Sequence, residues 1–189
     1  LRMAQRALRD GRPLDFASYL HYCEWSYTPP IAAAYEGCSS DWEEGDDLCS
    51  RVEACPWGDC YLRLGLADGV QDYCADLDTS IARGFNPELR YEMRQQVQDG
   101  RALCLHRRCG AAALPSLGAP DPADQLDFGY HCAHLYHAFC GVLASVYGQQ
   151  EGAALCNKVL ELYAERYGQP AVDTLLRLQD QDFSFLPQI

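Results

Sequence analysis

Apolar residues recur at steps of three and four along most of the chain, which is the spacing of one face of an α-helix. The clearest example is residues 61–82, where Leu62, Leu66, Val70, Tyr73 and Leu77 follow it. Similar patterns predict helices over residues 1–10, 16–27, 31–35, 122–148 and 152–167, and a last one from about residue 170 onward. No segment alternates apolar and polar positions with enrichment in β-branched residues, so few or no strands are expected.

Two start signals predict further helices. Ser40 and Glu43 have the spacing of a capping box, which predicts a helix over residues 41–55. The Asn-Pro pair at 86–87 places an N-cap before a proline in the first helical turn, which predicts a helix running towards residue 104.

These elements predict the all-α class. We expect a disulfide-stabilised helical bundle of about six to eight short and medium helices, with few or no strands. An Ala-, Pro- and Gly-rich connection over residues 110–121 divides the chain. Residues 1–109 form a disulfide-rich helical subdomain in this interpretation. Residues 122–189 form a C-terminal helical hairpin with a terminal helix, packed on the first part as one unit.

Cysteine makes up 11 of the 189 residues, several times its ordinary usage. None of the cysteines form a C-x-x-C pair, which argues against zinc ribbons and thioredoxin-like redox sites. A disulfide framework in an extracellular, cell-surface or secretory-lumen compartment is the remaining common explanation. The expected partners are Cys23, Cys38, Cys49, Cys55, Cys60, Cys74, Cys104, Cys109, Cys140 and Cys156. Cys132 is left unpaired, and it could link the chain to a second chain.

The chain carries 15 Lys and Arg against 27 Asp and Glu, a formal net charge of −12 at pH 7. Such a charge repels a phosphate backbone, so we expect no nucleic-acid partner. Nor does any stretch approach the ~20 consecutive apolar residues of a membrane-spanning helix.

One strip of a predicted helix combines a carboxylate with two imidazoles. On the helix over residues 122–148, Asp127, His131 and His134 lie within about 60° of one another. Three such ligands could hold Zn²⁺ and leave one position for water. A polar strip is also what a mostly buried helix shows to solvent or to a partner, and the H-E-x-x-H pattern is missing.

Two charged clusters are predicted to be exposed contact points for a protein partner, although each could simply be solvated surface. The first is an acidic loop, and the second is the most basic internal point of this acidic chain. Their residues are Trp42, Glu43, Glu44, Asp46 and Asp47 in the first, and His106, Arg107 and Arg108 in the second.

No enzyme fingerprint is present. The chain has no G-x-S-x-G, no phosphate-binding glycine loop and no G-x-G-x-x-G, so no catalytic residue is assigned and no cofactor is expected. The favoured interpretation is therefore a secreted, surface or lumenal cysteine-rich domain that binds another macromolecule, as a receptor, ligand or complex subunit. The alternative is a metal-dependent enzyme or metal-binding protein that holds zinc at the Asp127 strip.

Overall fold

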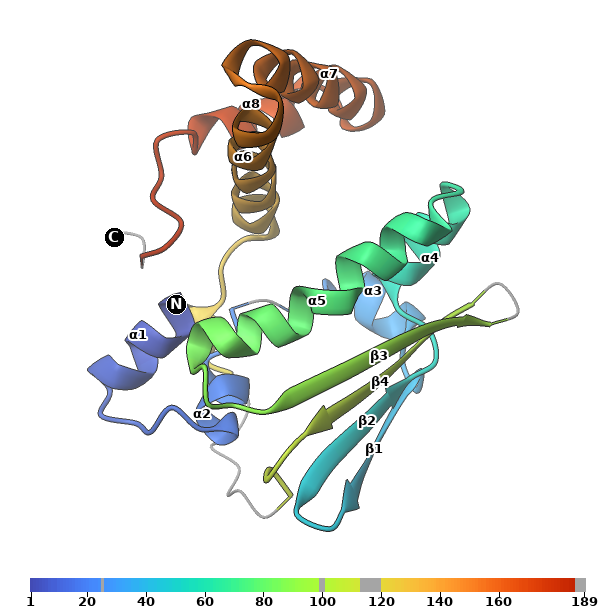
Figure 1. Ribbon diagram of the computed structural model, residues 1–189, viewed down its shortest axis with the longest axis vertical. Coiled ribbons are helices and arrows are strands. Elements are labelled where there is room, and N and C mark those ends of the chain that lie inside the picture. Colours follow the sequence, from blue (N-terminus) through green and yellow to red (C-terminus); the bar gives the residue numbers. More distant parts are fainter. Residues whose placement is uncertain (25, 99–100, 113–119, 186–189) are drawn as a thin grey trace. The chain divides into compact units, whose positions relative to one another are not determined.

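The computed structural model of the chain describes residues 1–24, 26–98, 101–112 and 120–185 (Figure 1). It divides the chain into two compact units, Leu1–Asp124 and Gln125–Ile189. Much of the connection predicted over residues 110–121 lies outside the described residues, because 113–119 are not among them.

The described residues form eight α-helices, four strands and one short 3-10 helix. In the first unit these are α1 (Arg2–Arg9), α2 (Phe16–His21), α3 (Pro29–Ala34), β1 (Ser39–Glu44), β2 (Asp47–Val52), α4 (Pro56–Arg63), α5 (Ala67–Phe85), β3 (Tyr91–Gln98), β4 (Arg101–Arg108) and the 3-10 helix η1 (Pro122–Asp124). In the second unit they are α6 (Phe128–Tyr147), α7 (Gln149–Tyr167) and α8 (Gln169–Arg177).

The all-α prediction is wrong, because the first unit contains a four-stranded antiparallel sheet in the order β1-β2-β4-β3. The helix predicted over residues 41–55 is instead the β1–β2 hairpin. The helix predicted from residue 87 towards residue 104 is replaced by β3 and β4, which pair with each other along their length.

The physical reason is that strand pairing overrode local preference. β3 consists largely of Glu, Met, Arg and Gln, which favour helices in isolation. Two of its larger apolar residues, Tyr91 and Met93, are nevertheless two positions apart, as on one face of a strand. Pairing with β4, a strand that also pairs with β2, favours the strand over the helix that these residues would prefer in isolation.

Most of the other predicted helices are confirmed, with one division. The segment predicted as a single helix over residues 61–82 lies in two helices, α4 and α5, which are separated at Gly65. Gly65 has a φ of +71°, a left-handed conformation that favours glycine over any residue with a Cβ. This break allows α4 and α5 to run in different directions.

Helix α5 lies along one face of the sheet and packs mainly on β3, while α4 contacts β4 (Figure 1). At its C-terminal end, Phe85 joins a buried cluster with Ala4, Ala7 and Tyr22. The helix face directed at the sheet also includes Asp78. The sheet and α5 thus enclose a layer in which both apolar and titratable side chains are present.

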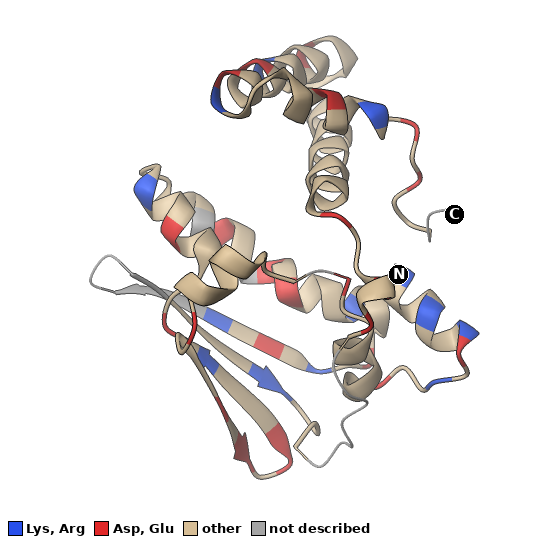
Figure 2. Cartoon of the chain, turned by 180° about the vertical axis from the view of Figure 1, so that it is seen from behind, with Lys and Arg blue, Asp and Glu red and all other residues tan. Residues whose placement is uncertain are grey.

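Two of the three arginines of α1, the helix beside the N-terminus in Figure 2, are buried rather than solvated: Arg2 and Arg6, but not Arg9. Arg2 donates to Glu24 through Nε at 3.0 Å, and Arg6 pairs with the same carboxylate. Arg6 also lies 3.1 Å from Asp124. Burial disfavours the charged form of Glu24, but the two arginines outweigh it and hold the pKa of Glu24 below its usual 4.5. The network ties α1 to the segment that leads to Tyr27.

Replacing Glu24 by alanine should destabilise the protein by about 3–5 kcal/mol, because Arg2 and Arg6 would stay buried without their counter-charge. Chemical denaturation of the full chain measures this loss. The control is Asp76→Ala, which removes an exposed partner of Arg83 and should change stability far less. Equal effects of the two substitutions would show that the buried network does not stabilise the fold.

The second unit consists of α6, α7 and α8. The disulfide between Cys140 and Cys156 joins α6 to α7, which pack closely. A Cβ added at Gly152 would lie 2.7 Å from backbone atoms of Ala144, so only glycine permits this approach. Helix α6 carries no Lys, Arg, Asp or Glu (Figure 2). None of the helices within the described residues combines the length and apolar character needed to cross a bilayer.

The predicted disulfide framework is also wrong. Cys140–Cys156 is the one disulfide among the described residues, and Cys132, predicted to be unpaired, is not part of it. Several cysteines outside this disulfide are buried, with Cys49 at 3% and Cys104 at 6% exposure. Free cysteine behaves as a small apolar residue, so a high cysteine count does not require cross-links.

Candidate functional site

The two clusters predicted as separate contact points meet in the sheet. Trp42, Glu43 and Glu44 lie on β1, Asp46 and Asp47 at the β1–β2 turn and the start of β2, and His106, Arg107 and Arg108 on β4. Arg107 Nε lies 2.5 Å from Asp47 Oδ2, and Arg107 Nη1 lies 3.7 Å from Glu44 Oε2. The opposite charges therefore pair with each other within the sheet, from β4 to β2 and to β1, although Trp42 remains 42% exposed.

Asp47 has a structural role in this arrangement. It accepts a hydrogen bond from the amide of Gly110 at 2.8 Å as well as from Arg107. These two donors lower the pKa of Asp47. The carboxylate thus fastens the end of β4, and the residues after it, to the start of β2.

The strip predicted as a zinc site does not form one. Asp127 accepts a hydrogen bond from the amide of Gly129 at 2.8 Å and so caps α6. The ring of His134 stacks on Phe183 with centroids 4.9 Å apart. Nowhere among the residues with described positions do three His, Cys, Asp or Glu side chains gather in a way that could hold a metal ion.

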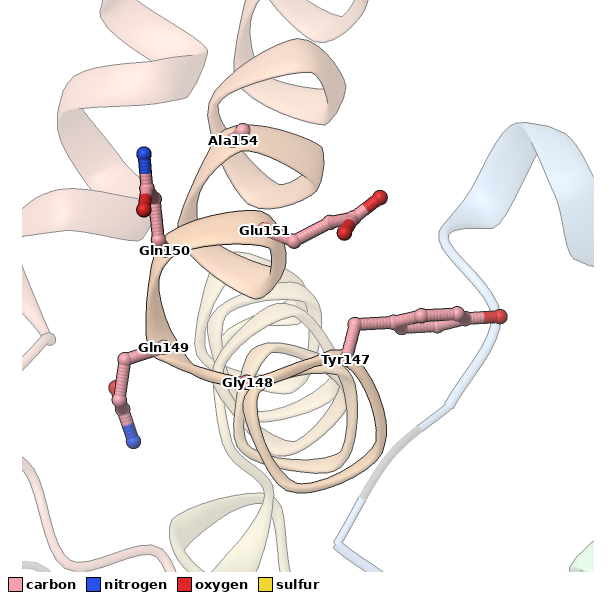
Figure 3. Close-up of a pocket in the computed structure, with 6 residues that line it drawn as sticks. All are labelled: Tyr147, Gly148, Gln149, Gln150, Glu151 and Ala154. Atoms are coloured by element: carbon pink, nitrogen blue, oxygen red, sulfur yellow. The ribbon is translucent and has the colours of Figure 1, made fainter.

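A surface hollow lies at the junction of α6 and α7. It is lined by Tyr147, Gly148, Gln149, Gln150, Glu151 and Ala154 (Figure 3). The polar side chains point in different directions, as Figure 3 shows, and no two of them converge on one point. A reactive site needs converging groups, so this hollow is a poor candidate for one.

Convergent polar groups lie instead on the sheet face that α5 covers. Because side chains alternate between the faces of a strand, Cys104, His106 and Arg108 point to the same side of β4. The register places Ser50 of β2 opposite His106, and Tyr91 of β3 opposite Arg108. Arg108 Nη1 donates to Ser50 Oγ at 2.8 Å, and its guanidinium lies 5.5 Å from the centre of the Tyr91 ring.

Asp78 of α5 faces His106 of β4. Asp78 Oδ2 lies 3.8 Å from His106 Nδ1, and the Tyr91 hydroxyl is hydrogen-bonded to the same nitrogen at 2.9 Å. The side chain of His106 is 12% exposed and that of Asp78 is 35% exposed. A carboxylate, an imidazole and a phenol are therefore assembled from three different elements in one partly buried place.

Burial moves the two pKa values of this pair towards each other. It raises the pKa of Asp78, against the attraction of His106 and Arg108. It lowers the pKa of His106 below 6.5, although Asp78 acts in the opposite direction. His106 is consequently neutral at pH 7, and the pair is able to accept a proton.

A cysteine thiol lies within the electrostatic influence of Asp78. Cys55 is the N-cap of α4, and its Sγ accepts the amide hydrogen of Gly58 at 3.2 Å. Burial raises the pKa of Cys55, the amides of Gly58 and Trp57 lower it, and the carboxylates of Asp59 and, more weakly, Asp78 raise it. The thiol is thus protonated at rest and held by amide donors that would stabilise a thiolate.

Tyr27 is a partly exposed residue within the electrostatic range of these groups. Burial raises its pKa, and Cys55, Asp78 and Cys104 raise it further. Its ring is 5.8 Å from that of Trp57, and the residue is 36% exposed. We call the set of Cys55, Asp78, Tyr91, Cys104, His106 and Arg108 the α5–sheet cluster.

Replacing Asp78 by asparagine should lower the pKa of His106 further, because the carboxylate is the group that stabilises its protonated form. Titration of the histidine side chains by NMR measures this shift. The control is Asp76→Asn on the exposed side of α5, which should leave the titration of His106 unchanged. An unchanged His106 in the Asp78 variant would contradict the pairing.

Sequence reasoning missed Cys55, Asp78 and Tyr91, and it placed His106 and Arg108 at an exposed point. Two signals were present. Pro56 at the first position of a helix marks Cys55 as its N-cap. The two-residue spacing of Cys104, His106 and Arg108 is that of one strand face. Asp78 gave no local signal, because its position opposite His106 depends on tertiary packing.

Comparison with known proteins gives one match. Residues 2–107 match the sequence family described as L-2-amino-thiazoline-4-carboxylic acid hydrolase. The match covers more than half of the 189 residues and lies within the first unit. Neither the curated proteins nor the solved structures yield a match. A family named for a hydrolase contradicts the interpretation as a secreted, cysteine-rich binding module, which is therefore wrong.

Proposed function

Because the chain belongs to the L-2-amino-thiazoline-4-carboxylic acid hydrolase family, we propose that it hydrolyses the ring of that compound or of a closely similar one. The reaction takes place at the α5–sheet cluster. The observation that carries this assignment is the Asp78–His106 pair, together with the Cys55 thiol, which caps a helix N-terminus and feels the charge of Asp78.

The location of the cluster supports the assignment. Tyr27, Cys55, Asp78, Tyr91 and His106 all fall within the residues that match the family. The surface hollow at Tyr147 falls outside them. A function attributed to the family is therefore best placed between α5 and the sheet.

The compound named by the family dictates the chemistry. Its ring carbon between sulfur and nitrogen also bears an amino group, so it is an electrophilic, isothiourea-type carbon. Hydrolysis adds one water, breaks one ring bond of this carbon and leaves a carbamoyl group. The enzyme needs a nucleophile for the carbon, a base for the proton that the nucleophile loses, and an acid for the leaving atom.

In this proposal Cys55 Sγ attacks the ring carbon, and its proton passes to the Asp78–His106 pair. The bond from that carbon to ring sulfur or ring nitrogen then breaks, and the leaving atom takes the proton back from the pair. Water next attacks the same carbon and gives a proton to the pair. The Cys55 sulfur leaves and recovers that proton, so the sum is substrate plus water.

Cys55→Ser should remove most of the hydrolysis of L-2-amino-thiazoline-4-carboxylic acid, since a hydroxyl is a far weaker nucleophile than a thiol. Asp78→Asn should reduce kcat by roughly 10²- to 10⁴-fold, the usual contribution of a general acid or base. Steady-state kinetics on the purified chain measure both effects. Cys60→Ser, a thiol elsewhere on α4, is the matched control and should retain activity. Full activity of the Cys55 variant would exclude this nucleophile.

The pH dependence follows from the Asp78–His106 pair, which titrates as one unit. Since the pKa of His106 is lowered from 6.5, the pair is deprotonated at pH 7 and takes up its first proton at lower pH. Activity should therefore be retained at pH 7 and lost as the pH falls below 6.5. A pH profile of kcat/KM tests this sign, and an acid limb centred above pH 6.5 would contradict it.

Three expectations from the sequence stay predictions, because no finding bears on them. They are a protein partner, the absence of a nucleic-acid ligand, and the compartment in which the protein works.

A further inference from the structure

Arg108, which is partly buried, differs from Arg2, Arg6 and Arg107 in having no acidic partner among the described residues. Arg2 and Arg6 both pair with Glu24. Arg107, the next residue on the opposite face of β4, pairs with Asp47. Among the described residues, Arg108 forms no ion pair, and its hydrogen-bond partners are the neutral side chains of Ser50 and Tyr91.

One N–H donor of the Arg108 guanidinium has no hydrogen-bond acceptor in the described part of the chain. Its Nε is buried, and no acceptor among the described residues lies within hydrogen-bond distance of it. A buried N–H of a charged group costs free energy when it has no hydrogen-bond partner. A bound ligand with a suitable acceptor would remove this cost. The guanidinium itself is held in place by Ser50 and by the ring of Tyr91. It is thus a fixed cation with an unused donor.

The Arg108 guanidinium lies close to the Asp78–His106 pair. Arg108 is on the same strand face as His106 and directly opposite Tyr91, which is hydrogen-bonded to His106. The pKa shifts of Asp78 and His106 both include an influence of Arg108. An anion bound by Arg108 would therefore lie next to the acid–base pair of the proposed reaction.

We propose that Arg108 binds the carboxylate of the substrate and thereby selects small ring compounds that carry an acid group. This inference rests on the proposed function and adds a specificity-determining residue to it. A guanidinium matches a carboxylate with two parallel N–H donors, which fixes the orientation of a ligand as well as its affinity. The carboxylate held at Arg108 would leave the opposite end of the ring free to approach Cys55.

Arg108 is immediately beyond the residues that match the family, 2–107. The family match therefore does not include this residue.

Binding of unreactive ring compounds tests the subsite apart from catalysis. L-Thiazolidine-4-carboxylate has the ring and the acid group but lacks the amino-substituted carbon, and its 4-carboxamide lacks the charge. Calorimetry on the full chain should show that the acid binds at least roughly tenfold more tightly than the carboxamide, as expected for a hydrogen bond to a charged group. Arg108→Gln should remove this difference, Arg108→Lys should retain part of it, and Arg107→Gln should leave it intact.

The outcomes separate this inference from the proposed function. If Arg108→Gln removes the preference for the acid while the wild-type chain hydrolyses no aminothiazoline acid, the subsite stands and the proposed function fails. If the wild-type chain hydrolyses the compound and Arg108→Gln leaves KM unchanged, the proposed function stands and the subsite is refuted. Equal binding of acid and carboxamide, or no binding of either by the wild-type chain, also refutes it. The expected kinetic effect is a KM raised roughly tenfold or more with a much smaller change in kcat.

Discussion

The pairing of β4 between β2 and β3 is the constraint on which the site depends. Side chains change faces at every residue of a strand, so a shift of one residue would turn His106 and Arg108 away from α5 and bring Leu105 and Arg107 in their place. The contacts of Asp47 with Arg107 and Gly110 oppose such a shift from the other face of the sheet. The charged residues at the β1–β2 turn thus support the site without belonging to it.

The buried charged groups of the first unit are of two kinds, those that are fully paired and those that are not. Glu24 is fully engaged by Arg2 and Arg6, which suits a network that only holds segments together. Asp78 lies 3.8 Å from His106, beyond hydrogen-bond distance, and burial disfavours the charge on both. Because the two groups do not hydrogen-bond to each other, each could still form a hydrogen bond to a substrate. Their positions are fixed in advance by α5 and the sheet, which is what preorganised catalysis requires.

The sequence predicted the helices well and the sheet not at all, for a reason that lies in the site itself. On β4 the covered positions are Cys104, His106 and Arg108, so the face that is normally apolar is polar here. The alternation of apolar and polar residues that marks a strand is thereby lost, although the side chains still alternate between the two faces of the sheet. The partners of His106 come from residues 78 and 91, and only the packing of α5 and β3 brings them together. Buried cysteines such as Cys104 also gave the chain the composition of a disulfide-rich protein.

The proposed place of binding and reaction is the space between α5 and β4. The sharpest test is a crystal structure of the Cys55→Ala variant soaked with L-2-amino-thiazoline-4-carboxylic acid. We expect the carboxylate at Arg108, the amino-substituted ring carbon facing position 55, and Asp78 and His106 beside the ring. A ligand bound elsewhere, for example in the hollow at Tyr147, or one in the cluster with its carboxylate turned away from Arg108, would contradict it.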